Sequence, residues 1–205
     1  MQGQKSNPHQ LAQTIHQAPS IIYSASKDYE TLGHITLYSD GQALIGLTMP
    51  TQQYTLPLIK TGKERTSPPV KEIAYSDSLN HSEFRDGFAW LDTYTKGQQP
   101  KVFPALHLLG TDFRCRVWHE LLHIPYGQVI TYGDLAKRIY KNDTVRGMQA
   151  RAIGGAVGHN PLPIIIPCHR VVGSHKQLTG YTGGLHVKKA LLTIEGLDIH
   201  QYKDA

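Results

Sequence analysis

Apolar and polar residues alternate between residues 32 and 49, as they do in a β-strand with one buried face. The alternation is interrupted at Asp40-Gly41, and an Asp-Gly dipeptide between two alternating runs predicts a β-hairpin. We therefore expect a small β-rich unit in the first half of the chain. The polar, proline-containing residues 61–70 predict a loop that follows this unit.

Apolar residues recur at helical spacing within residues 82–96, and Gly97 is a suitable stop signal. The side chains that define the spacing are Phe84, Phe88, Leu91 and Tyr94. This segment is therefore predicted to form a helix.

The remainder of the chain has a mostly helical pattern. Thr111 is a suitable cap for one helix, and Thr131 is a suitable cap for a short helix over residues 132–139. A second short helix is predicted over about residues 148–157, and two short helices joined by a turn suggest a helix-turn-helix. A last helix is expected over residues 185–195.

The length of 205 residues suffices for one large domain or two small ones. We expect an α/β protein with a flexible N-terminal segment at residues 1–20, an α/β domain at residues 21–108 and a mostly helical domain at residues 109–205. No run approaches the roughly 20 apolar residues of a membrane span, and residues 1–20 lack the apolar core of an export signal. We therefore expect a cytoplasmic protein without a membrane partner.

A net charge of +5 and a pI of about 9.1 favour a polyanionic partner, although many basic proteins bind none. The two cysteines, Cys115 and Cys168, are too few for a cysteine-based zinc site or a disulfide framework. We expect no bound metal and a reducing intracellular setting, which suits a reactive thiol. A disulfide between the two cysteines is the alternative, and a catalytic role for Cys168 argues against it.

The most informative segment is residues 160–171, which read Asn-Pro-Leu-Pro-Ile-Ile-Ile-Pro-Cys-His-Arg-Val. Pro167 has no N–H, so the strand-like run at residues 164–166 can stop abruptly and present Cys168 at the edge of a pocket. A thiol attacks as the thiolate, and the neighbouring imidazole of His169 can help to form it. The alternative for Cys168 is a buried structural cysteine.

This segment resembles the O6-alkylguanine-DNA alkyltransferases, also called methylated-DNA–protein-cysteine methyltransferases, whose hallmark is Pro-Cys-His-Arg-Val after an Asn-Pro turn. The resemblance extends from about Thr111 to Gly196, with all motifs in the family's order. The other matching motifs are Val117-Trp118, Ile124-Pro125-Tyr126-Gly127, Thr131-Tyr132-Gly133, Arg151-Ala152-Ile153-Gly154-Gly155-Ala156 and Leu178-Thr179-Gly180-Tyr181-Thr182-Gly183-Gly184. The resemblance implies a ribonuclease H-like α/β N-terminal domain and a C-terminal domain with a helix-turn-helix.

The resemblance assigns the chemistry to five residues. Cys168 would be the nucleophile, His169 would take its proton through a water, and Glu195 would hold and charge the imidazole. Tyr132 would donate a proton to the leaving base, and Asn160 would bridge the helix-turn-helix and the reactive loop. For Glu195 the alternative is a solvated residue at a helix end.

The resemblance also implies a guanine pocket and a DNA-binding surface. The substrate-binding residues would be Val157, Val171, Tyr181, Thr182 and Lys188. The DNA-contacting residues would be Thr131, Gly133, Gln149, Ala150, Arg151 and Ser174. The helix of Arg151 would lie in the minor groove, and the arginine would enter the base stack where the target nucleotide leaves. The alternatives are a core role for Tyr181 and a solvated surface role for Arg151 and Lys188.

These assignments imply an enzyme that reverses O6-alkylguanine, and also O4-alkylthymine, in double-stranded DNA after base flipping. The alkyl group would pass irreversibly to Cys168, once per molecule, without a cofactor, and the protein would act as a monomer. Two alternatives stay open: a non-enzymatic helix-turn-helix lesion sensor or regulator, and a cysteine hydrolase that uses Cys168 and His169. A cysteine at position 168 favours transfer over sensing, and irreversible labelling by O6-benzylguanine would distinguish transfer from hydrolysis.

Overall fold

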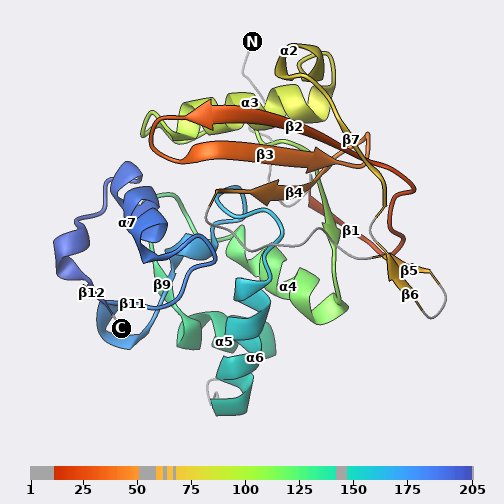
Figure 1. Ribbon diagram of the computed structural model, residues 1–205. Coiled ribbons are helices and arrows are strands. Elements are labelled where there is room, and N and C mark those ends of the chain that lie inside the picture. The colour runs from red at the N-terminus through yellow and green to blue at the C-terminus, as the bar shows by residue number, and fades with distance from the viewer. Residues whose placement is uncertain (1–11, 51–58, 62–63, 67, 142–146, 205) are drawn as a thin grey trace, which may run out of the picture.

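Six strands form one mixed sheet in the upper part of the molecule (Figure 1). The computed structural model describes residues 12–50, 59–61, 64–66, 68–141 and 147–204. In spatial order the strands are β1 (Ala12–Ile15), β8 (Leu106–Leu109), β4 (Leu44–Thr48), β3 (Gly33–Ser39), β2 (Ile22–Tyr29) and β7 (Val70–Glu72). The neighbours β2, β3 and β4 pair antiparallel, whereas β1 with β8, β4 with β8 and β2 with β7 pair parallel.

The predicted hairpin is confirmed, because β3 and β4 are antiparallel neighbours joined through Asp40-Gly41. The Asp40 carboxylate closes the turn by accepting hydrogen bonds of 2.9 Å from the backbone N–H groups of Gln42 and Ala43. Gly41 has a φ of +90°, a conformation that a residue without a Cβ adopts readily. Local turn chemistry therefore sets the register of this part of the sheet.

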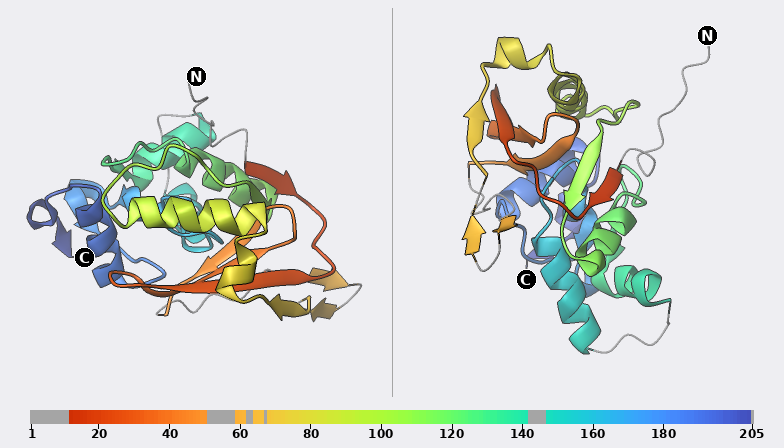
Figure 2. Two further views of the ribbon diagram at one scale, coloured as in Figure 1. Left: turned by 90° about the horizontal axis from the view of Figure 1, so that it is seen from above. Right: turned by 90° about the vertical axis from the view of Figure 1, so that its right-hand side faces the viewer.

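Helix α3 (Ser82–Tyr94) lies across one face of the sheet, as the view from above in Figure 2 shows, and the single turn α2 (Tyr75–Ser78) precedes it. The predicted helix over residues 82–96 is thus confirmed. Its four diagnostic side chains are buried: Phe84, Phe88, Leu91 and Tyr94. A Cβ on Gly87 would lie 2.8 Å from Leu44 Cδ1, so the glycine lets the helix approach β4 closely.

Two expectations for polar segments are wrong in part. Strand β1 lies within residues 1–20, where we expected a weakly ordered segment, and it pairs with β8 along its whole length. Its partner comes much later in the sequence, so no local pattern could reveal the pairing. Near the expected loop at residues 61–70, β5 (Ile59–Thr61) and β6 (Glu64–Thr66) form an antiparallel pair. Their isoleucine and threonines are β-branched residues that suit extended backbone.

Four helices dominate the second half of the chain: α4 (Asp112–Leu121), α5 (Tyr132–Tyr140), α6 (Gly147–Gly158) and α7 (Leu185–Ile194). The first three pack against one another below the sheet, and α7 lies to one side (Figure 1). Thr111 and Thr131 cap α4 and α5 as predicted, and Asp134 completes a capping box with Thr131. The residues that join α5 to α6, 142–146, lie outside the described part, so the turn that we predicted between these two helices is not tested.

Short elements lie between these helices and after α7. The two-residue strands are β9 (Ile130–Thr131) beside β10 (Val171–Val172), and β11 (Gln177–Leu178) beside β12 (Lys203–Asp204). The short 3-10 helices are η1 (Cys168–Arg170), η2 (Ser174–Lys176) and η3 (Ile199–Gln201).

The run Ile164–Ile166 is a buried turn rather than the strand-like segment that we expected. Ile164 has a φ of +74°, and the N–H of Ile166 donates a 2.8 Å hydrogen bond to the carbonyl four residues before it. All three isoleucines are at most 1% exposed, so their apolar character reflects burial and not strand pairing. The N–H of Leu47 in β4 donates to the carbonyl of Pro161 at 2.9 Å, which ties this loop to the sheet.

The sheet and the helices share one continuous core. A single cluster of buried apolar side chains includes Leu37 of β3, Phe88 of α3, Val117 of α4 and Ile165 of the reactive loop. The second view in Figure 2 shows α4, α5 and α6 below the sheet, on the side away from α3. The two halves of the chain therefore stabilise each other.

We expect Phe88→Ala to lower the free energy of unfolding by about 3–5 kcal/mol, because the side chain is 1% exposed and its loss leaves a cavity under α3. Urea denaturation followed by circular dichroism measures this loss. Leu79→Ala is the control, since Leu79 is 37% exposed and its truncation should change stability by only about 0.5 kcal/mol. Equal losses for the two variants would contradict the packing described for α3.

Candidate active site

A pocket of about 510 Å³ opens between α5, α6 and the segment that leads into α7. Its lining residues are Tyr132, Ala150, Gly154, Val157, Gly158, Cys168, Thr179, Gly180, Tyr181 and Thr182. Cys168 is the first residue of η1, is only 3% exposed and contributes the thiol of this lining. The structure thus brings the predicted nucleophile together with four predicted pocket or proton-donor residues.

Asn160 holds the backbone on both sides of the reactive loop. Its Nδ2 donates to the carbonyl of Ile166 at 2.7 Å, and its Oδ1 accepts from the N–H of Leu162 at 3.0 Å. The N–H of Cys168 donates to the same Ile166 carbonyl at 2.8 Å. The position of the thiol is therefore fixed by one buried amide side chain at the end of α6.

His169 and Glu195 form a buried pair next to Cys168. His169 Nε2–H donates to Glu195 Oε1 at 2.6 Å, and neither side chain is exposed to solvent. A carboxylate can only accept, so Nε2 carries the hydrogen and Nδ1 keeps the basic lone pair. Nδ1 is buried, and within the described ranges no residue hydrogen-bonds to it. The pair therefore offers one imidazole nitrogen as a base.

Glu195 receives several further hydrogen bonds. Arg170 donates to it from Nε and Nη2 at 2.9–3.1 Å, the N–H of Gly127 donates at 3.0 Å, and the Tyr94 hydroxyl donates at 2.8 Å. Burial alone would raise the pKa of Glu195, but the hydrogen bond from His169 and the charge of Arg170 lower it to about 2. The carboxylate is therefore ionised throughout the physiological pH range.

Burial keeps the thiol and the imidazole neutral. It raises the pKa of Cys168, although the Asn160 hydrogen bond and the charge of Lys188 oppose this shift. It also lowers the pKa of His169, against the attraction of Glu195. The site can therefore form a thiolate by passing the thiol proton towards His169, with the ionised Glu195 ready to stabilise the imidazolium.

Two predicted substrate-binding residues, Val171 and Lys188, do not line the pocket. Both are buried, and Lys188 Nζ donates to the carbonyls of Val171 at 2.7 Å and Thr179 at 3.0 Å. Burial lowers the pKa of Lys188 to about 8. The ammonium group thus joins the two segments on either side of η2, and one of them, at Thr179, lines the pocket.

The predicted DNA-contacting residues gather around the starts of α5 and α6, except for Ser174, which is exposed in η2. Arg151 is exposed in α6, whereas Gln149 and Ala150 are half-buried. A Cβ on Gly154, Gly155 or Gly158 would meet no atom within 4 Å, so the outer face of α6 is flat and open.

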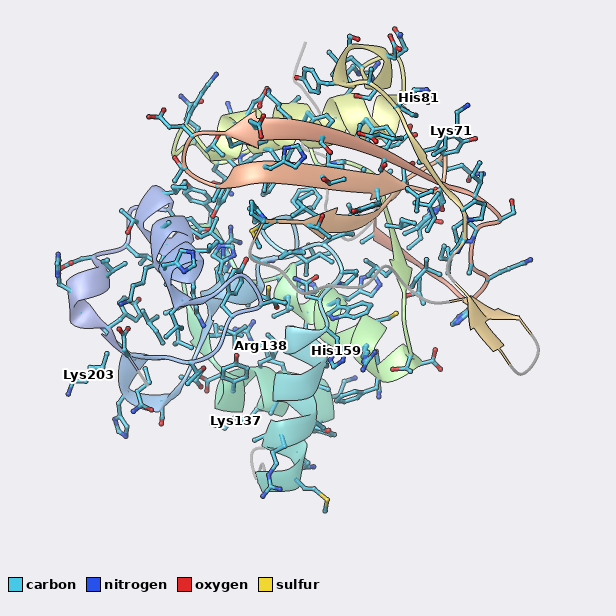
Figure 3. The ribbon with its side chains drawn as sticks, viewed as in Figure 1. Lys71, His81, Lys137, Arg138, His159 and Lys203 are labelled. Atoms are coloured by element: carbon cyan, nitrogen blue, oxygen red, sulfur yellow. The ribbon has the colours of Figure 1, made fainter. Side chains whose placement is uncertain are left out.

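Basic side chains lie near this face. Figure 3 labels Lys137 and Arg138 of α5 and His159, which follows α6, in the lower half of the molecule. Lys71, in the edge strand β7, and His81, just before α3, lie at the opposite end. Helix α5, whose first residue Tyr132 lines the pocket, therefore carries the positive charges of Lys137 and Arg138 in its last turn.

Sequence reasoning missed two polar partners of Glu195. Arg170 had a usable signal, because it is a charged residue that closely follows the apolar run at residues 164–166. Tyr94 had none, because its spacing matched the apolar face of α3. Thr179, Gly154 and Gly158 were also missed as pocket residues.

Among the residues that the structure describes, no three His, Cys, Asp or Glu side chains are close enough to hold a metal ion. The same ranges contain no helix that combines the length and the apolar character needed to cross a membrane.

Comparisons with known proteins agree with the site geometry. Residues 112–197 match the family described as 6-O-methylguanine DNA methyltransferase, DNA binding domain. The chain is 38% identical over 164 residues to the methylated-DNA–protein-cysteine methyltransferase of Mycobacterium tuberculosis, covering 80% of this chain and 87% of that protein. It is 41% identical over 128 residues to the Methanosarcina acetivorans protein of the same name, covering 62% of this chain and 79% of that one.

The fold matches solved structures of the same class. The crystal structure of Mycobacterium tuberculosis OGT in complex with DNA superposes with a TM-score of 0.66 and 35% identity, covering 88% of this chain and 95% of that one. The α/β arrangement of a mixed sheet and helices is therefore shared with this class. The chain belongs to the methylated-DNA–protein-cysteine methyltransferase family.

Acidification should destabilise the protein through Glu195. The pKa of Glu195 in the folded protein, about 2, lies below the ordinary value of 4.5. Its stabilising contribution is therefore complete above about pH 4.5 and is lost as the pH falls towards 2. Glu195→Gln should be less stable at neutral pH and should lose less stability between these two pH values than the wild type. Urea titrations at several pH values measure this difference.

Glu30→Gln is the matched control, because Glu30 is exposed. It should keep the wild-type decline with pH. An unchanged decline in Glu195→Gln would show that other carboxyl groups cause the acid sensitivity.

Proposed function

We propose that this protein repairs double-stranded DNA carrying O6-alkylguanine by transferring the alkyl group to Cys168. One observation carries this proposal: a cysteine lines a pocket of about 510 Å³ directly beside a buried His169–Glu195 pair with a free basic nitrogen. Family membership and the relative's complex with DNA support it. The activity is that of a single-turnover methylated-DNA–[protein]-cysteine S-methyltransferase.

The reaction moves one proton and one alkyl group. His169 Nδ1 takes the thiol proton through a water, and Glu195 stabilises the resulting imidazolium. The thiolate forms a carbon–sulfur bond to the alkyl carbon, while the bond from that carbon to O6 breaks and its electron pair moves into the guanine ring. Tyr132 donates a proton to the ring and regains one from His169 through solvent. The thioether on Cys168 is stable, so each molecule reacts once.

Substrate binding requires base flipping, because the alkyl group cannot meet the thiol inside the base stack. In this proposal Val157 and Tyr181 enclose the flipped base and the N–H of Thr182 faces O6. All three residues line the pocket. Burial raises the pKa of Tyr132, so its hydroxyl keeps the proton that it donates. Lys188 supports the pocket through the carbonyls of Val171 and Thr179.

We assign DNA binding to α5 and α6, which act as a helix-turn-helix with α6 in the minor groove. The open face at Gly154 and Gly155 suits close approach of the backbone, and the exposed Arg151 fills the space that the flipped base leaves. Thr131, Gly133, Gln149, Ala150 and Ser174 contribute further contacts.

Several finer assignments belong to the same proposal. The pocket accepts O4-alkylthymine as well, and the protein acts as a monomer. The chain is organised as a ribonuclease H-like α/β domain over residues 21–108, to which the sheet adds β1 at residues 12–15, and a C-terminal alkyl-transfer domain at residues 109–205. A lesion sensor or regulator would need no nucleophile, and the placement of Cys168 favours transfer over that function. A cysteine hydrolase would regenerate its thiol, which the first experiment below tests.

Transfer should be stoichiometric. After incubation with excess O6-methylguanine duplex, we expect the intact mass to rise by one methyl group on the peptide that contains Cys168. Cys168→Ser should bind the duplex normally but should not be alkylated, because a hydroxyl is far less acidic than a thiol. Cys115→Ser should react like the wild type, because Cys115 is buried in the core away from the pocket. Many turnovers per protein molecule would favour a hydrolase.

Arg151→Ala should slow repair of the duplex much more than reaction with free O6-benzylguanine, because only the duplex must release a base at a cost of a few kcal/mol. Single-turnover rates on both substrates test this difference. Arg85→Ala removes the same charge from α3, in the opposite layer, and should leave both rates near those of the wild type. Equal losses on both substrates in Arg151→Ala would mean that this arginine supports the fold.

A further inference from the structure

A hydroxyl group from the first half of the chain completes the buried cluster around Glu195. Tyr94 is the last residue of α3 and precedes His169 by 75 residues and Glu195 by 101. Its hydroxyl donates to Glu195 Oε1 at 2.8 Å and lies 3.2 Å from His169 Nε2. The end of α3 therefore touches both members of the catalytic pair, beside α7 in Figure 1.

The hydrogen bonds of Tyr94 have a defined direction. A tyrosine hydroxyl has one proton, and the carboxylate can only accept, so that proton points to Glu195. The hydroxyl oxygen can then only accept a hydrogen bond from His169 Nε2. That contact is favourable only when Nε2 carries a hydrogen. Burial, together with the charge of Glu195, raises the pKa of Tyr94 well above its ordinary value, so the hydroxyl keeps its proton. The Glu195 carboxylate and the Tyr94 hydroxyl oxygen, both facing Nε2, thus favour the imidazole tautomer with its hydrogen on Nε2 and its basic lone pair on Nδ1.

The aromatic ring of Tyr94 is held firmly. It is fully buried and stacks on Trp90, with ring centroids 5.2 Å apart and planes 9° apart. It also makes edge contacts with Tyr126 at 6.0 Å and with His169 at 6.3 Å between centroids. The position of the hydroxyl is therefore set by α3 and not by the loop that carries the thiol.

We propose that Tyr94 is a positioning residue that fixes the orientation and tautomer of the His169–Glu195 pair, so that α3 sets the reactivity of Cys168. This inference rests on the alkyl transfer proposed above. It gives a chemical role to a helix that lies outside the matched residues 112–197. It also explains why a tyrosine, and not another apolar residue, ends the buried face of α3.

A purely structural role is the competing explanation. The Tyr94 hydroxyl also lies 3.4 Å from the carbonyl of Leu191 and would then only hold α7 against α3. Tyr126 offers a matched comparison, because its hydroxyl donates to the carbonyl of Ile194 at 3.0 Å, at the same end of α7. Removing each hydroxyl in turn separates tethering of the helix from positioning of the pair.

The test measures the rate constant for benzyl transfer from free O6-benzylguanine to Cys168 as a function of pH. Tyr94→Phe should lower the maximal rate constant by about tenfold, as expected for loss of a hydrogen bond to a charged group. It should also move the midpoint of the pH profile to higher pH, because loss of one donor to Glu195 makes His169 a stronger base and His169 must be neutral to accept the thiol proton. Tyr126→Phe should stay within about twofold of the wild type and keep its midpoint.

The midpoint of the pH profile reports the protonation of the His169–Glu195 pair. Arg170 and Lys188 are the charged groups that act on His169 besides Glu195, and every variant retains them. In a Glu195→Gln background, Tyr94→Phe should add less than about a twofold loss, because Tyr94 acts through the carboxylate. Thermal unfolding of each variant shows how much stability the lost hydroxyl carried.

A second replacement keeps the test decisive if Tyr94→Phe does not fold. Site-specific 3-fluorotyrosine at position 94 retains the ring and the hydroxyl, and its hydroxyl is a stronger donor. The midpoint should then move to lower pH, opposite to the shift in Tyr94→Phe. An unchanged midpoint in both variants would overturn the proposal, and so would equal losses of rate and stability in Tyr94→Phe and Tyr126→Phe. Failure of the wild type to accept the benzyl group would instead overturn the proposed function.

Discussion

One buried carboxylate, that of Glu195, holds several distant segments of the chain together. An ionised group can remain in a protein interior only when donors and a counter-charge surround it. Those donors come from α3 through Tyr94, from the turn at Gly127, and from η1 through His169 and Arg170. These segments lie far apart in the sequence, so satisfying the carboxylate specifies how they meet. The fold and the site are stabilised by the same contacts.

Glu195 contributes negative charge to the site without acting as a base. With Arg170 beside it, the pKa of Glu195 is about 2, so it is too weak a base to remove the proton from His169 Nε2. It acts through its charge, which favours a second proton on Nδ1. Burial meanwhile keeps the resting Cys168 and His169 uncharged. A neutral thiol is a poor nucleophile, which limits side reactions until a substrate fills the pocket.

Local signals in the sequence predicted most of the fold, because turn and cap chemistry act over a few residues. Asp40-Gly41 and the capping residue Thr131 are examples. Pairing at long range could not be predicted, so β1 was missed. The run at residues 164–166 was misinterpreted because apolar composition indicates burial without specifying backbone conformation.

In the candidate site, too, local motifs could be predicted and contacts between distant segments could not. The motif around Cys168 and His169 was visible in the sequence, and the structure places Glu195 beside it. Tyr94 was visible only as an apolar position in a helix, because periodicity shows which side chains are buried but not which polar atoms they meet. The pocket residue Thr179 could not be predicted for a similar reason. Its place in the pocket depends on tertiary contacts, such as the hydrogen bond from Lys188 to its carbonyl, that no local sequence pattern reveals.

The long sequence separation of the cluster has a consequence for the newly synthesised chain. Tyr94 leaves the ribosome about 100 residues before its partner Glu195, and Cys168 and His169 emerge between them. During that interval the imidazole has no carboxylate to charge it, and the thiol has no organised base. In the proposed alkyl transfer, the thiol therefore becomes reactive only after α7 has folded. The newly synthesised protein is then protected from using its one proposed reaction before folding is complete.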